Sequence, residues 1–222
     1  MDYQVELIKE KLRRLNIVFF DLDGTLINTE HLYFRFWKEA SKYYGYELGD
    51  EETLSMRSRE RKSAEEYLYK VSGGLLDYNL TRNKRIELMN EYFKDHPIEL
   101  KEGAEELLQK LSSEGKKLYI VTANAIEKSE GILKSTNISS YFTSIISAKE
   151  VERGKPYPDV YLYACAKIVV SPDQVIVFED SPNGLISSFK AGCFTVMVED
   201  LTPFTKDMDY VDGAISSLNK LI

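Results

Sequence analysis

Short, mostly apolar runs recur along the chain, and each is bounded by polar or turn-forming residues. Continuous runs of this length are typical of strands that are buried on both faces of a parallel sheet. They predict strands at residues 17–20, 118–121, 144–147, 175–178 and 195–198. The first of these runs, IVFF, stops abruptly at Asp21.

Segments with apolar residues at helical spacing lie between many of these runs. One apolar stripe precedes Gly115 and consists of Ala104, Leu107, Leu108 and Leu111. Another helix should have Ser181 as its N-cap and Pro182 as its first residue, and it should end at Gly192. The alternation of strands and helices predicts an α/β fold with a doubly wound, Rossmann-like parallel-sheet core.

The chain between the first two predicted strands is far too long for a single crossover helix. Residues 28–97 carry several helical patterns rich in Tyr, Arg, Lys and Glu, so we predict a small α-helical cap domain inserted there. The core would then consist of residues 1–27 and 98–222. Residues 1–15 should form an extra docking helix, because one helical face gathers Val5, Ile8, Leu12 and Leu15.

Composition and charge narrow the functional classes. The 222 residues are 43% hydrophobic and 29% charged, as in a globular protein with a proper core. The net charge of −7 argues against nucleic acid as a partner, because a phosphate backbone requires a basic surface. The chain has no apolar stretch near the roughly 20 residues of a membrane span and no signal-peptide core. We therefore expect a cytoplasmic protein without a membrane partner, and we expect a monomer.

Asp21 and Asp23 place two carboxylates directly after the first apolar run, and three structural explanations compete with a functional one. An Asp-Gly pair between apolar runs is typical of a tight hairpin turn. A calcium loop is excluded by spacing, since Gly24 is the fourth residue counted from Asp21 and not the sixth, and Leu32 replaces the required glutamate. Helix capping by one aspartate would leave the other unexplained.

Other predicted strands deliver polar side chains to the same edge, because ligands of open α/β sheets bind beyond the carboxyl ends of the strands. The residues expected there are Asp21, Asp23, Thr122, Ala123, Asn124, Lys155, Glu179 and Asp180. Two unit charges about 4 Å apart repel by about 4 kcal/mol at an effective dielectric constant of about 20. Four carboxylates at one edge therefore predict a bound cation, and an all-oxygen ligand set favours Mg²⁺ together with a substrate phosphate.

Four motifs resemble those of a known family: DLDGT at residues 21–25, Thr122 after the second strand, GKPYPD at 154–159 and FEDSPNG at 178–184. In this order they resemble the haloacid dehalogenase superfamily, over about residues 17–198. The branch that is most similar inserts a helical cap after the first motif and includes phosphoglycolate-phosphatase-like and β-phosphoglucomutase-like proteins. The resemblance implies a Mg²⁺-dependent phosphatase that hydrolyses a small phosphorylated metabolite, such as a sugar phosphate, through an aspartyl-phosphate.

The resemblance also implies a role for each acidic residue. Asp21 would be the nucleophile that attacks phosphorus. Asp23 would protonate the leaving alcohol and then activate water, and its backbone carbonyl would bind the metal. The carboxylates of Asp21 and Asp180 would bind the metal directly, and Glu179 would act on it through water or indirectly.

Further roles concern the phosphate. By the same resemblance, the Thr122 hydroxyl and nearby backbone N–H groups, at Ala123 and Asn124, would hold the phosphate oxygens. Lys155 would neutralise charge on the phosphoryl group and restrain Asp21. Asn124 also fits a second role, as a cap of the next helix.

Basic residues concentrate in the predicted cap, within SMRSRERKS at residues 55–63. Such a run is usually a solvated face. The similar branch places a specificity loop in this region, so Arg57 is a candidate contact for a substrate anion, and Lys84 is a weaker one. His31, just past the hinge, is a further substrate candidate, although a histidine at such a position is more often a solvated helix residue.

Two alternative functions stay open. A β-phosphoglucomutase-type phosphosugar mutase is suggested by Thr29, Phe34, Arg35 and Trp37, which are similar to that group. Tyr33 weakens this alternative, because it stands where the cap-hinge histidine of the mutases is expected. A catalytically inactive binding or regulatory module is the other alternative, although every expected motif residue is present. A dehalogenase is excluded, since those relatives lack a counterpart of Asp23.

Overall fold

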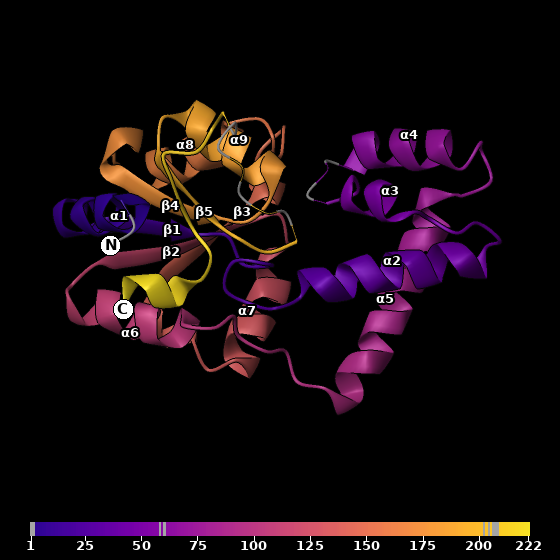
Figure 1. Cartoon of the computed structure of the whole chain (residues 1–222), viewed down its shortest axis with the longest axis horizontal. Helices are drawn as coiled ribbons and strands as arrows, with labels where there is room; N and C mark the ends of the chain where they lie inside the picture. The colour runs from indigo at the N-terminus through magenta and orange to yellow at the C-terminus, as the bar shows by residue number, and fades with distance from the viewer. Residues whose placement is uncertain (1–2, 58, 60, 202, 204, 206–208) are drawn as a thin grey trace.

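The computed structural model describes residues 3–57, 59, 61–201, 203, 205 and 209–222. Its centre is a parallel sheet of six strands in the order β3-β2-β1-β4-β5-β6 (Figure 1). The strands are β1 (Ile17–Phe20), β2 (Lys117–Thr122), β3 (Phe142–Ser147), β4 (Val175–Glu179), β5 (Phe194–Val198) and β6 (Gly213–Ile215). The predicted α/β fold with a Rossmann-like parallel sheet is confirmed. The short strand β6 was not predicted, because GAI forms no apolar run that stands out.

Helices cover both faces of this sheet, and the alternation of side chains along each strand explains why. Val18 and Phe20 of β1 belong to a hydrophobic cluster with α1 (Tyr3–Arg14), α6 (Ala104–Ser113) and α7 (Ile126–Ser135). Phe19 points to the opposite face, into a cluster with α8 (Asp159–Lys167) and with Ala191 of α9 (Pro182–Ala191). Short 3₁₀ turns lie at Ser139–Tyr141, Ala148–Glu150, Pro172–Gln174 and Leu218–Leu221.

Local signals set the ends of α9 as the sequence predicts. The Ser181 hydroxyl accepts a hydrogen bond from the Gly184 N–H at 3.1 Å, and Pro182 is the first helical residue. Gly192 ends the helix with φ of 89°, a left-handed conformation that favours glycine. The start of α9 therefore lies directly after Asp180, at the carboxyl end of β4.

The hairpin explanation of Asp21 and Gly24 is wrong. β1 lies between β2 and β4 and runs parallel to both, so the chain after Phe20 does not fold back as an antiparallel partner. Gly24 instead supports a tight turn beyond the sheet, with φ of 79°. This turn leads the chain out of the core toward the next helices.

Of the helices between β1 and β2, α6 packs on the sheet, whereas the other four stand apart from its layers (Figure 1). They are α2 (Glu30–Tyr43), α3 (Asp50–Leu54), α4 (Arg61–Val71) and α5 (Tyr78–Asp95), and we call them the cap helices. Their buried apolar residues form clusters without sheet residues, one of which contains Trp37 and Leu68, and another Phe36 and Met89. That residues 28–97 are a separate domain stays a prediction.

The extra helix at the N-terminus packs against the core. Val5, Ile8 and Leu12 of α1 are buried, and the Gln4 side chain accepts a hydrogen bond from the Ala214 N–H of β6 at 3.2 Å. Among the helices that the structure describes, none combines the length and the apolar character needed to cross a bilayer.

Candidate active site

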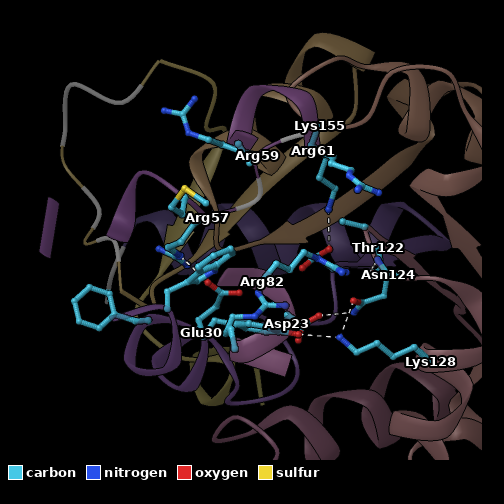
Figure 2. A pocket seen from close by; sticks show the side chains of 18 of the residues that line it. Asp23, Glu30, Arg57, Arg59, Arg61, Arg82, Thr122, Asn124, Lys128 and Lys155 are labelled. Atoms are coloured by element: carbon cyan, nitrogen blue, oxygen red, sulfur yellow. Dashed lines mark hydrogen bonds and ion pairs between the residues drawn. The ribbon is translucent and has the colours of Figure 1, made fainter. Parts of the chain in front are cut away.

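A cavity of about 520 Å³ lies between the carboxyl edge of the sheet and the cap helices (Figure 2). Predicted site residues that line it are Asp21, Asp23, Arg57, Thr122, Ala123, Asn124 and Lys155. Asp180 and Glu179 lie beside Asp21, since one carboxylate oxygen of each of the three residues lies within 4.8 Å of the others. Residues that are far apart in the sequence therefore meet at one edge of the sheet, as the motifs predict.

Lys155 joins Asp21 to Glu179 in a buried cluster. Its ammonium donates to Asp21 Oδ1 at 2.7 Å and also to Glu179 Oε1. Burial disfavours its charged form, but the attraction of Asp21 and Glu179 outweighs burial and raises the pKa of Lys155 well above its usual value. Lys155 therefore remains a cation next to Asp21.

Glu179 is fully buried and both of its carboxylate oxygens are engaged by the protein. Oε1 accepts from Lys155 and from the Tyr161 hydroxyl, the latter at 3.1 Å. Oε2 accepts from the backbone N–H groups of Asp180 and Ser181 at 3.1 and 3.2 Å. These contacts favour an indirect role, in which Glu179 orients Lys155 and the turn that carries Asp180.

The acidic groups here outnumber their cations, since Asp21, Glu179, Asp180 and Glu30 contact only Lys155 and Arg57 among the ion pairs of the described residues. Burial raises the pKa of Asp21 well above its usual range, although Lys155 acts in the opposite direction. Burial, with repulsion from Glu30 and Glu179, raises the pKa of Asp180 in the same way. A cluster of carboxylate oxygens that lacks sufficient positive charge fits a hard divalent cation such as Mg²⁺.

Asp23 is held by two donors at the cavity wall. The Thr29 hydroxyl donates to Oδ1 at 2.7 Å, and the Asn124 side-chain amide donates to Oδ2 at 2.6 Å. Gly24 allows the turn that carries Asp23 to lie against the Asp180 side chain. A Cβ at residue 24 would lie 2.3 Å from Asp180 Oδ2. The Asn124 side chain therefore positions Asp23, while Ala125 occupies the N-cap of α7.

The loop after β2 presents the predicted phosphate-binding residues to the cavity. The buried Thr122 hydroxyl accepts a hydrogen bond from the Asn124 N–H at 3.2 Å, which fixes the turn. The Ser147 hydroxyl donates to the Asn124 carbonyl at 2.5 Å and ties this loop to β3. Thr122, Ala123 and Asn124 thus line the same cavity as Asp21.

Arg57 reaches from the cap helices to the acidic cluster. Its Nε donates to Glu30 at 2.8 Å and its Nη2 donates to Asp180 Oδ2 at 2.5 Å, while Asp200 lies at 3.7 Å. Its side chain is only 6% exposed. Burial alone would lower the pKa of Arg57, but Glu30 and Asp180 raise it. The role of Arg57 as a substrate contact stays a prediction; its observed partners are carboxylates.

Two other predicted substrate contacts lie elsewhere. His31 is exposed, its Nδ1 lies 3.1 Å from Asn28 Oδ1, and it is not among the described residues that line the cavity. The Lys84 ammonium pairs with Glu87 at 2.8 Å, on the surface of α5. Of the basic run at 55–63, residues 58 and 60 lie outside the part of the chain that the structure describes.

Several cavity residues were missed by the sequence reasoning. They include Glu30, Arg82, Arg85, Lys128 and Lys149. Arg82 and Arg85 are three residues apart on one helix, which places both on the same side of α5. That spacing could have singled them out, but only the packing of α5 over the sheet edge shows that this side faces the cavity.

Known proteins are similar to this chain in sequence. The family model for haloacid dehalogenase-like hydrolases matches residues 18–198. A validoxylamine A 7'-phosphate phosphatase from Streptomyces hygroscopicus subsp. limoneus is 33% identical over 187 residues, 81% of this chain and 84% of that protein. A phosphorylated carbohydrates phosphatase from Thermotoga maritima is 26% identical over 182 residues, 80% of this chain and 82% of that protein.

Known structures share the fold. A crystal structure of β-phosphoglucomutase from Clostridium difficile superposes with a TM-score of 0.75, over 94% of this chain and 93% of that one. The two sequences are 20% identical, so this likeness concerns the fold alone.

Proposed function

The chain belongs to the haloacid dehalogenase-like hydrolases, and from this premise we propose that it is a Mg²⁺-dependent phosphatase of a small phosphorylated metabolite. The observation that carries the proposal is the buried group in which Lys155 contacts Asp21 at 2.7 Å beside Asp180 and Glu179. A sugar phosphate is the substrate class that the names of the two related phosphatases support.

The proposed reaction begins with attack of an Asp21 oxygen on phosphorus. A bond forms between Asp21 and phosphorus while the bond from phosphorus to the leaving alcohol breaks, and Asp23 gives its proton to that alcohol. Water then attacks the aspartyl-phosphate, Asp23 takes a proton from it, and phosphate leaves. The hydrogen bonds from Thr29 and Asn124 hold Asp23 at the wall where the alcohol would lie.

Positive charge makes this attack of one anion on another feasible. Lys155 and the backbone N–H groups after Thr122 would orient and neutralise the phosphate oxygens. A bound Mg²⁺, held by Asp21, Asp180 and the Asp23 carbonyl, would supply further charge neutralisation for the phosphoryl group. Glu179 would keep Lys155 and the Asp180 turn in place.

The first test is hydrolysis of p-nitrophenyl phosphate with and without divalent cation. We expect turnover in MgCl₂, loss of turnover in excess EDTA, and recovery when MgCl₂ is returned in excess of the chelator. Full activity in EDTA would contradict Mg²⁺ dependence, and no activity under any condition would support the binding-module alternative. Conversion of β-glucose 1-phosphate to glucose 6-phosphate without release of phosphate would identify a mutase.

A second expected result concerns Arg57 and the metal. Both oxygens of Asp180 accept from protein donors, Oδ1 from the Thr25 hydroxyl at 3.2 Å and Oδ2 from Arg57 at 2.5 Å. A cation that binds Asp180 must therefore compete with Arg57. We expect Arg57→Gln to tighten Mg²⁺ binding by about tenfold, corresponding to about 1.4 kcal/mol, in calorimetric titrations without substrate.

Arg59→Gln is the matched control for that titration. Arg59 belongs to the same basic run, but its guanidinium donates to the Ser63 hydroxyl at 3.2 Å and lies 4.4 Å from the Tyr67 ring centroid. Its replacement should leave the Mg²⁺ dissociation constant unchanged. Equal or weaker Mg²⁺ binding by Arg57→Gln would show that the ion pair with Asp180 does not oppose the metal.

A further inference from the structure

Three basic side chains gather on the part of the cavity wall that carries Asp23. Arg82 and Arg85 come from α5 of the cap helices, and Lys128 comes from α7 of the core. Figure 2 shows Lys128 next to Asn124 and Asp23, across the cavity from Arg57. The three cations thus belong to two separate elements that meet over one small region.

Arg85 is held in place by aromatic rings and has an unused donor. Its guanidinium carbon lies 4.8 Å from the Tyr33 ring centroid and 4.9 Å from that of Trp37. Its Nε is buried and has no hydrogen-bond partner within the described structure. A buried N–H of a charged group without an acceptor is costly, and such groups commonly mark a place where a ligand supplies the acceptor.

Lys128 also contacts Tyr33, and its hydrogen bonds to described residues go to uncharged acceptors. Its ammonium donates to the Tyr33 hydroxyl at 2.9 Å and to Asn124 Oδ1 at 3.0 Å. Burial lowers the pKa of Lys128, and nearby Arg85 and Arg82 lower it further, while Asp23 opposes this. Burial likewise lowers the pKa of Arg85, and Arg82 adds to this. Three neighbouring cations therefore repel one another here.

Lys155, Arg57 and Arg61 also line the cavity, but acidic side chains balance them. Lys155 is paired with Asp21, and Arg57 is paired with Glu30. Arg61 is paired with Glu65 at 3.0 Å. For Arg82, Arg85 and Lys128, by contrast, no carboxylate among the described residues lies within 4.0 Å. Within the described structure, the charge of these three side chains near Asp23 is therefore not balanced by a carboxylate in direct contact.

We propose that Arg82, Arg85 and Lys128 form an anion subsite for a second acidic group of the substrate, a carboxylate or a second phosphate. The inference rests on the proposed phosphatase function and narrows its substrate class. Because the cations lie beside Asp23, which would protonate the leaving alcohol, the second acidic group belongs to that alcohol. Phosphorylated sugar acids and sugar bisphosphates have this chemistry, and simple sugar monophosphates lack it.

The test compares matched ligands that differ in one group. Open-chain phosphate esters of two to six carbons are prepared with CH₂OH, carboxylate or CH₂-phosphate at the far end; sorbitol 6-phosphate and 6-phosphogluconate are one such pair. Their affinities for the Asp21→Asn variant with MgCl₂ are measured by calorimetry, so the readout does not require turnover. We expect an acidic ligand of at least one length to bind about 30-fold more tightly than its matching alcohol. The carboxylate and phosphate arms identify which anion is preferred.

Arg85→Gln is combined with Asp21→Asn and tested in the same way. The acidic ligand should then bind no more than about threefold more tightly than its matching alcohol, because the Gln side chain keeps polar contacts but not the charge. Arg61→Gln is the matched control, since it also removes one positive charge from the cavity lining, and it should keep the advantage. If no acidic ligand is preferred at any length, or if Arg85→Gln weakens alcohol and acid ligands equally, the subsite is refuted. Hydrolysis of p-nitrophenyl phosphate by the unmodified chain tests the phosphatase function separately.

Discussion

Asp21→Asn is expected to lower turnover of p-nitrophenyl phosphate by about 10⁴-fold or more, because the amide cannot attack phosphorus as the carboxylate does. Measurement of kcat in saturating MgCl₂, with phosphate release as the readout, checks this. Incubation with substrate followed by acid quenching and mass spectrometry should detect a phosphorylated protein for the unmodified chain and none for the variant.

The fold should survive this change, because asparagine has nearly the same shape and removes a charge that is costly to bury. Lys155 retains its contact with Glu179 when the charge on Asp21 is lost. We therefore expect the midpoint of thermal unfolding to change by less than about 4 °C, equivalent to about 1 kcal/mol in a chain of this length. Residual turnover above about 1% in a folded variant would show that Asp21 is not the nucleophile.

Lys155→Met is expected to have the largest effect on stability. Removing the ammonium leaves Asp21 and Glu179 buried next to each other without their shared cation. Breaking a buried ion pair by deleting one partner typically costs about 3–5 kcal/mol, because an uncompensated charge stays in the interior. Urea denaturation in EDTA should therefore show a free energy of unfolding that is lower by about this amount, and turnover should also be lost.

Lys149→Met provides the matched control for stability. Lys149 also lines the cavity, but the residue is exposed, and its replacement should change the free energy of unfolding by less than about 0.5 kcal/mol. Addition of MgCl₂ to Lys155→Met should recover part of the lost stability, because a bound cation would again balance the acids. An unchanged urea midpoint in Lys155→Met would show that the buried acids do not depend on this lysine.

Arg57 and Asp180 illustrate how conformational coupling could arise in this molecule. Arg57 belongs to the loop between α3 and α4, whereas Asp180 directly follows β4, and the two residues are 123 positions apart in the sequence. Competition between this arginine and Mg²⁺ would link metal binding to the position of the cap helices. The calorimetric comparison of Mg²⁺ binding by Arg57→Gln and Arg59→Gln tests the competition on which this link depends.

The sheet and the central residues of the site could be predicted from the sequence because their signals are local. Four-residue apolar runs determine buried strands, and parallel strands necessarily present their carboxyl ends at one edge. Asp21 and Asp180 each follow a predicted strand, so the sequence places both at this edge; that they are neighbours there depends on the pairing of β1 with β4 in the structure. The Ser181-Pro182 pair similarly determined where α9 begins.

Only the tertiary structure decided how the cap helices complete the cavity. The pairing of Arg57 with Asp180, the placement of Lys128 against Tyr33 and the exposure of Arg85 to the cavity all join segments that are distant in sequence. A charged residue on a helix has the same local pattern whether it faces solvent or a ligand, so periodicity cannot distinguish the two. The distinction depends on how α2 and α5 lie across the cavity from the sheet edge, because that arrangement sets which charges are desolvated and which find partners.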